Sequence, residues 1–190
     1  MVTALIKTVK SKLNLRRITY LTGLIGVAII VVATLMTALE FSGPNGTAYS
    51  ILNYKISTLG KPEFSGWATF FNWGLKIGGL FLIAFIVGLS LYVGHRAMLV
   101  VGLAGVVMAS GVVLVGVCPV TEPQCHSMAA QIIFFSGMAT TVSFTVVLLL
   151  VDQKKLSKWL ALPSAIASLA FAGFVLILYS LYENPQRTFI

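Results

Sequence analysis

Few side chains of this chain combine a reactive type with the spacing that chemistry requires. Hydrolysis by a serine needs a hydroxyl nucleophile, a base within hydrogen-bond reach and a group that orients the base. The sequence offers Ser57 and His126 for these roles, and no Gly-x-Ser-x-Gly elbow surrounds Ser57. We treat both as candidate catalytic residues; the sequence favours a protein that is not an enzyme, with an enzyme as the alternative.

Metal binding is the second chemistry to consider, and the spacing of the histidines argues against it. His95 and His126 are the two histidines, and no His-x-x-x-His or comparable ligand spacing occurs. A histidine beside a membrane-flanking loop most often bonds to the loop backbone and to water. We therefore predict no metal and no cofactor, and we keep His126 as a candidate ligand-binding residue.

Cys118 and Cys125 are the only cysteines, and they enclose a loop with two prolines. Six residues separate them, which does not match a redox Cys-x-x-Cys motif. We predict a structural disulfide, which an oxidising compartment allows. Two free thiols and a redox-active pair are the alternatives.

Five long apolar runs must position these side chains. The composition is 58% hydrophobic and 9% charged, whereas soluble proteins average about 25% charged residues. A helix of about 20 apolar residues crosses a bilayer. The runs cover about 18–39, 70–93, 97–117, 127–151 and 159–181. The sequence predicts an all-α, polytopic integral membrane protein, a five-helix transmembrane bundle that forms one membrane domain over residues 1–190.

Basic residues fall in every second gap between the runs, and such an excess marks the cytoplasmic side. These residues are Lys7, Lys10, Lys12, Arg16, Arg17, Arg96, Lys154, Lys155 and Lys158. The other gaps are acidic or balanced in charge. We predict a multi-pass protein of the cell (plasma) membrane, with the N-terminus cytoplasmic and the C-terminus outside. Because the basic residues flank helix ends without interleaved aromatic residues, we expect no nucleic acid partner.

One basic residue lies inside a run rather than beside it. Lys76 follows Asn72 by four residues, so the two share a helix face. Trp67 and Trp73 indicate an outer aromatic belt nearby. The Lys76 ammonium can therefore snorkel outward or pair with a carboxylate such as Glu40. Contact with a lipid phosphate is the alternative.

Small residues recur four positions apart inside the runs, which lets helix backbones approach closely in lipid. The pairs are Gly74 with Gly78, Ala84 with Gly88, and Gly105 with Ala109. We expect these pairs to pack helices of one chain together. An interface between copies of the chain is the alternative.

Several short motifs occur in a fixed order along the chain. An apolar first run is followed by Ile56-Ser57-Thr58-Leu59-Gly60, Phe71-Asn72-Trp73-Gly74-Leu75, Gly116-Val117-Cys118-Pro119, His126-Ser127-Met128-Ala129-Ala130 and Phe134-Phe135. From about residue 18 to 181 the chain resembles the small prokaryotic membrane proteins catalogued as domain of unknown function 998. The resemblance implies a helical membrane bundle with Ser57, Asn72 and His126 near its outer mouth. It implies no activity, and Tyr54-Lys55, Lys76 and Cys118 depart from the family pattern.

The expected function is binding or structural. An outer-facing pocket would hold a lipid or small amphiphile, with Asn53, Ser57, Asn72, Lys76, His126 and Gln131 as its ligand-binding residues. The chain could instead be a small subunit of a membrane complex. Alternatives are an intramembrane enzyme acting on lipid head groups at the outer face, and a small channel or carrier. The expected partners are membrane lipids, with a homo-oligomer or a larger membrane complex as further alternatives.

Overall fold

Five long helices make up most of the molecule. The computed structural model describes the backbone of residues 2–183, and the side chains of residues 14–177 and 179. The helices are α1 (Val2–Leu39), α2 (Ala68–Val93), α3 (Ala97–Val117), α4 (Pro123–Leu150) and α5 (Ala161–Glu183). Three short 3-10 helices, η1 (Pro44–Gly46), η2 (Ile56–Gly60) and η3 (Lys158–Leu160), lie in the connections. Each of the five regions contains a helix long and apolar enough to cross a membrane, which confirms the all-helical class and fits a multi-pass membrane protein.

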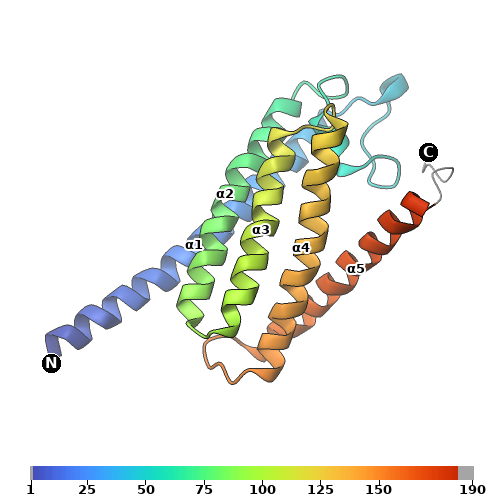
Figure 1. Ribbon diagram of the computed structural model, residues 1–190. Coiled ribbons are helices and arrows are strands. Elements are labelled where there is room, and N and C mark those ends of the chain that lie inside the picture. Colours follow the sequence, from blue (N-terminus) through green and yellow to red (C-terminus); the bar gives the residue numbers. More distant parts are fainter. Residues whose placement is uncertain (1, 184–190) are drawn as a thin grey trace.

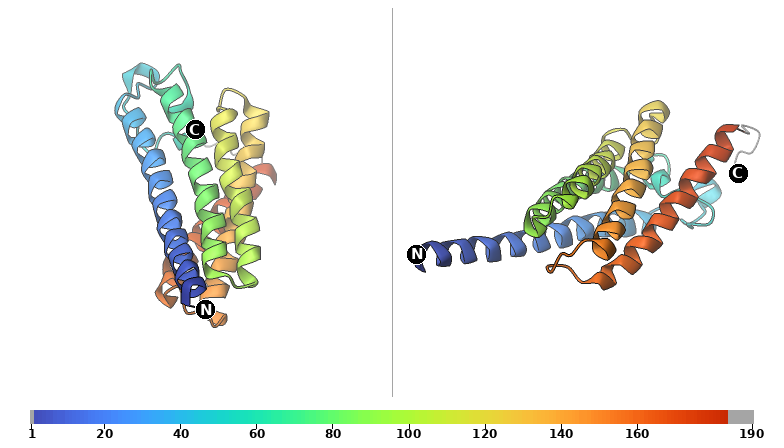
Figure 2. Two further views of the ribbon diagram at one scale, coloured as in Figure 1. Left: turned by 90° about the vertical axis from the view of Figure 1, so that its left-hand side faces the viewer. Right: turned by 60° about the horizontal axis from the view of Figure 1, so that its bottom comes forward.

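Successive helices run antiparallel and pack in chain order (Figure 1). The loops over residues 40–67 and 118–122 lie at one end of the bundle, here called the long-loop end. The short connections α2–α3 and α4–α5 lie at the opposite end, the short-loop end. Within the described residues, the extensive helix contacts join consecutive helices only (Figure 2). The bundle is therefore an open row with α1 and α5 on its two sides.

Glycines bring the first three helices close together. A Cβ at Gly26 would lie 3.0 Å from the Gly78 carbonyl oxygen, and one at Gly79 would lie 2.7 Å from Val113 Cγ2. Ala33 and Gly74 face each other at the same α1–α2 crossing. Close backbone approach of this kind is how small residues stabilise helix pairs in lipid. The Gly74 and Gly78 pair therefore packs helices within one chain, as expected.

The largest differences between the helices and the predicted runs are the starts of α4 and α1. α4 begins at Pro123 rather than at 127, because a proline in the first helical turn gives up no intrahelical hydrogen bond. α1 continues back to Val2, through the segment expected to be a basic tail. α2 ends close to the predicted boundary, where Gly94 adopts φ 68°, a left-handed conformation that favours glycine.

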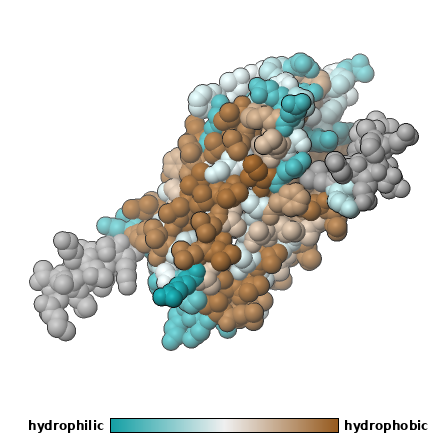
Figure 3. Space-filling view, in the orientation of Figure 1, coloured by the Kyte–Doolittle hydropathy of each residue, from teal (hydrophilic) through white to brown (hydrophobic). Residues whose placement is uncertain are grey.

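The surface is apolar around the middle of the helices and polar toward both ends (Figure 3). Large apolar side chains are exposed on every helix, including Leu35, Leu80, Leu103, Leu149 and Leu169. Exposed apolar surface on this scale fits a molecule surrounded by lipid tails. The described residues also form two small buried clusters. One lies at the short-loop end around Met98, and one at the long-loop end around Leu59.

Candidate ligand-binding site

The loop over residues 40–67 is seated on the start of α2. Leu59 of η2 is fully buried and packs with Phe41 and Phe71. The Asn72 side chain donates from Nδ2 to the Gly60 carbonyl oxygen at 3.3 Å. A Cβ at position 60 would lie 2.6 Å from Asn72 Oδ1, so glycine permits this approach. Asn72 therefore positions the loop and has its donor engaged there.

Lys76 lies one turn beyond Asn72, where α2 crosses α3. A Cβ at Gly116 would lie 2.9 Å from Lys76 Cγ, so the glycine leaves room for the lysine stem. The Lys76 Nζ atom lies 3.8 Å from the centroid of the Trp73 ring. Helical side chains lean toward the N-terminus of their helix. The ammonium is accordingly directed toward the long-loop end, where α2 begins.

The contact between Lys76 and Trp73 is a cation–π interaction on a lipid-accessible part of α2. Trp73 is 54% exposed and Lys76 is half-buried. An ammonium over an indole face gains about 0.5–2 kcal/mol, with the larger values in drier surroundings. Since the ring covers one side of the ammonium, its remaining N–H donors can reach an acceptor from outside the chain.

Ser57 and Asn53 lie in the same loop without sharing a network. Ser57 is half-buried on η2, whereas Asn53 is exposed in a turn closed by its backbone N–H to the Ser50 carbonyl oxygen at 3.0 Å. In the part of the chain that the structure describes, no side-chain hydrogen bond joins Ser57 to His126. Ser57 and His126, the candidate nucleophile and base, are therefore not hydrogen-bonded to each other.

His126 and the two cysteines join the end of α3 to the beginning of α4. Cys118 and Cys125 form a disulfide with a Cα–Cα distance of 5.7 Å, as predicted. His126 Nδ1 lies 2.9 Å from the Cys118 carbonyl oxygen. Because a carbonyl oxygen only accepts, Nδ1 carries the hydrogen, and Nε2 of the neutral ring remains an acceptor. The imidazole therefore bonds to loop backbone, one of the partners expected for it.

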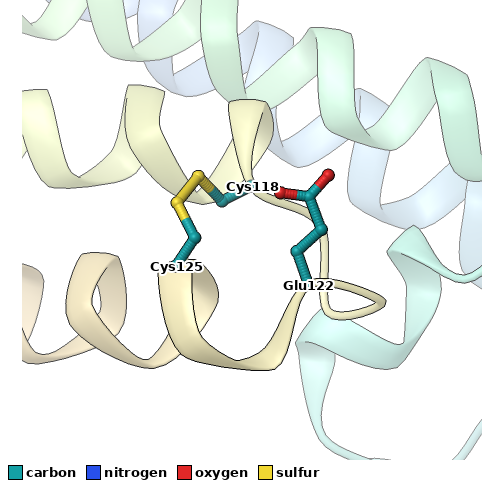
Figure 4. A group of neighbouring side chains, drawn as sticks. All are labelled: Cys118, Glu122 and Cys125. Atoms are coloured by element: carbon teal, nitrogen blue, oxygen red, sulfur yellow. A yellow bond between two sulfur atoms is a disulfide. The ribbon is translucent and has the colours of Figure 1, made fainter.

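Glu122 lies beside the disulfide and gives this corner a superficial likeness to a metal site (Figure 4). Its carboxylate oxygen and the two Sγ atoms lie within 4.8 Å of one another. Metals bind cysteine as the thiolate, and two sulfurs bonded to each other are not thiolates. An open hollow of about 300 Å³ is lined here by Glu122, Pro123, Gln124 and Cys125. The oxidised corner offers a carboxylate and no thiolate ligand.

Gln131 is exposed on α4, five residues after His126 and so about 140° around the helix from it. The structure therefore joins some predicted site residues to neighbours but not to one another. Asn72 contacts the loop at Gly60, and His126 contacts Cys118.

Trp73 and Gly116 contribute to the surroundings of Lys76, and sequence reasoning gave neither that role. Trp73 and Lys76 are three residues apart, and residues at this spacing are neighbours on a helix surface. That spacing was the signal from which their contact could have been predicted. Gly116 carried no such signal, since its approach to Lys76 depends on how α2 and α3 cross. Comparisons with protein-family models, with curated proteins and with solved structures found no match to this chain.

Proposed function

We propose that this chain is an integral membrane protein that binds an anionic amphiphile on the outer surface of α2. Lys76 and Trp73 would contact the head group. The observation that carries the proposal is the Lys76 ammonium held 3.8 Å above the Trp73 ring, inside a membrane-length helix. A charged side chain within a membrane-length apolar helix is costly and by default indicates a functional site.

The surface beside Lys76 also suits the tail of an amphiphile. Exposed side chains continue along one face of α2 at helical spacing, and they are Trp73, Ile77, Leu80, Val87 and Leu91. The stripe begins beside the ammonium and runs toward the short-loop end. A ligand with an anionic head and an apolar chain would place its head at the Lys76 ammonium and its chain along the apolar stripe. The proposed site is an open helix face, whereas the sequence predicted an outer-facing pocket.

The contacts of α4 favour binding over transport. Its hydroxyl side chains donate to carbonyl oxygens of their own helix: Ser136 to Ile132, Thr140 to Ser136, Thr141 to Gly137, Ser143 to Ala139 and Thr145 to Thr141. Hydroxyls satisfied in this way do not form a continuous polar track across the membrane. The unlinked positions of Ser57 and His126 likewise give the enzyme alternative little support.

A second candidate function is that of a small subunit in a membrane complex. The open row favours it, because α1 and α5 each pack extensively against one neighbouring helix among the described residues. Their remaining faces are apolar and available to lipid or to another transmembrane helix. A homo-oligomer would use the same faces.

Native mass spectrometry of the protein in mild detergent tests the leading proposal. We expect wild-type protein to retain phosphatidylglycerol, and Lys76→Met to bind it about fivefold less tightly, since a basic residue near a lipid surface contributes about 1 kcal/mol. Lys76→Arg should retain most of the binding, and Lys154→Met, which removes an exposed lysine at the short-loop end, should change little. Equal lipid retention by Lys76→Met and wild type would refute the site. Co-release of other polypeptides at fixed stoichiometry would support the subunit function.

A further inference from the structure

The loop over residues 40–67 carries an apolar tip outside the five helices. Ile51, Leu52 and Ile56 are 77%, 92% and 56% exposed. Scattered apolar residues are normal on a protein surface, but these three lie within six residues of chain. Lipid tails around the helices explain the exposed apolar side chains of the spans. They do not by themselves explain this group, which we call the loop tip (residues 50–56).

The loop tip is presented from a packed base. The Phe41 ring lies 5.5 Å from Tyr49 and 4.9 Å from Tyr54, measured between centroids. The Tyr54 hydroxyl and Thr47 Oγ1 are 2.5 Å apart, and the Tyr54 backbone N–H donates to the Ser50 carbonyl oxygen at 2.9 Å. These contacts fix both ends of the tip. Its apolar side chains are therefore held outward by the fold of the loop.

The same base places the tip close to the membrane level. Phe41 and Leu59 of the loop pack with Ala38 of α1 and with Phe71 and Leu75 of α2. Those helical residues belong to membrane-length segments. The loop thus folds down onto the helix ends instead of extending away from them, at the level where the lipid head groups are expected.

The composition of the tip also matches an interface between lipid and water. Between Phe41 and Pro62 the chain contains two charged residues, Lys55 and Lys61, and both are basic. Lys55 lies within the tip and is exposed. Apolar side chains flanked by tyrosine and lysine are characteristic of segments that lie in the head-group region, where the ammonium meets phosphates.

We propose that the loop tip inserts Ile51, Leu52 and Ile56 into the boundary between head groups and acyl chains of the membrane that the helices cross. A protein partner fits the observations less well. Three side chains supply far less than the roughly 800 Å² per partner of a stable interface. A bilayer, in contrast, would border the ends of the membrane-length helices on which this loop packs. This surface is separate from the α2 face of Lys76, so either proposal can fail alone.

A spin label at Leu52→Cys tests the insertion in full-length protein reconstituted into vesicles of equal phosphatidylcholine and phosphatidylglycerol. Oxygen concentrates in the bilayer, whereas a nickel chelate stays in water. We expect the label at 52 to collide severalfold more with oxygen than with the chelate. Glu63→Cys is the matched control, exposed in the same loop, and should show the opposite preference. Labelling without reductant leaves the native disulfide intact.

The vesicles contain one protein, and contact between its copies would lower collisions with oxygen as well as with the chelate, so a high oxygen collision rate can come only from the bilayer. Equal chelate accessibility at positions 52 and 63 would overturn the proposal. If the label at 52 is water-accessible in vesicles but protected in native membranes, a protein partner covers the tip and the proposal is wrong. A second label at Ile51→Cys must agree with the first, which guards against a local effect of one substitution.

Discussion

At the scale of single residues, Tyr49 has a hydroxyl group that its surroundings do not satisfy. The oxygen is buried and has no hydrogen-bond partner among the described residues. Burial raises the pKa of the Tyr49 phenol above its ordinary value of 10.0. The folded protein therefore holds this proton more tightly than the unfolded chain does. The resulting stability is fully present below about pH 10 and is lost as the pH rises through the higher folded pKa.

Replacing Tyr49 by phenylalanine should therefore stabilise the protein. Tyr49→Phe keeps the ring that packs on Phe41 and removes an unsatisfied hydroxyl. We expect the free energy of unfolding to rise by up to about 1 kcal/mol at neutral pH. We also expect a smaller loss of stability above about pH 10. Thermal unfolding in detergent across this pH range measures both effects.

Tyr54 supplies the control for that experiment. Its hydroxyl bonds to Thr47 Oγ1 at 2.5 Å, so Tyr54→Phe should lower stability by about 1 kcal/mol. The two variants lose the same atom from the same aromatic cluster. Equal destabilisation by both would mean that the Tyr49 hydroxyl has a partner after all.

At the scale of elements, Lys155 connects the two short loops. Its Nζ donates to the Tyr92 carbonyl oxygen at 2.5 Å and to the Val93 carbonyl oxygen at 3.0 Å. These are carbonyls of the last turn of α2, which lack intrahelical partners and carry the negative end of the helix dipole. A residue of the α4–α5 connection thus caps α2.

Loss of this cap should loosen the short-loop end. We expect Lys155→Met to lower the free energy of unfolding by about 1 kcal/mol, because the exposed ammonium is partly screened by water. Hydrogen exchange at the backbone N–H groups of 92–97 should become faster. Lys154→Met removes the same charge from the exposed neighbouring position and should have little effect. Matching changes in the two variants would assign the effect to charge rather than to the cap.

Sequence reasoning located the helices but not this cap, and the difference has a physical basis. Hydropathy reports where about 20 consecutive apolar residues can cross a bilayer, so α2 and α3 have nearly their predicted bounds. Hydropathy does not show where a helix ends once it leaves the apolar run, so the start of α4 at Pro123 was not predicted. Contacts such as Lys155 to Tyr92, or Asn72 to Gly60, depend on the path of a loop. No local sequence pattern encodes that path.

At the scale of the whole molecule, the sequence also did not predict that the five helices pack as an open row. All five helices are apolar on most sides, so periodicity gives no sign of which faces meet. Packing is decided by particular contacts. Between α4 and α5 these include the stacked rings of Phe134 and Phe174, with centroids 3.7 Å apart, and the Ser164 hydroxyl donating to the Thr141 carbonyl oxygen at 2.9 Å.

Orientation in the membrane is the property of the whole molecule that the charge pattern predicts most directly. The short-loop end has Arg96, Lys154, Lys155 and Lys158 beside it, so the positive-inside rule predicts that this end faces the cytoplasm. A membrane-impermeant maleimide applied to intact cells should therefore label Glu63→Cys at the long-loop end. It should label Asp152→Cys only after the cells are opened. Both positions are exposed, so differences in burial do not decide the outcome.

The native cysteines provide an internal check on the labelling. Because Cys118 and Cys125 are bonded, wild-type protein should stay unlabelled without reductant, whether or not the cells are opened. The disulfide also lies at the long-loop end, and oxidising surroundings outside the cell would preserve it. If intact cells label Asp152→Cys but not Glu63→Cys, the orientation is the opposite of the one predicted. The loop tip and Lys76 would then contact the cytoplasmic leaflet, whose anionic lipids an ammonium attracts more strongly.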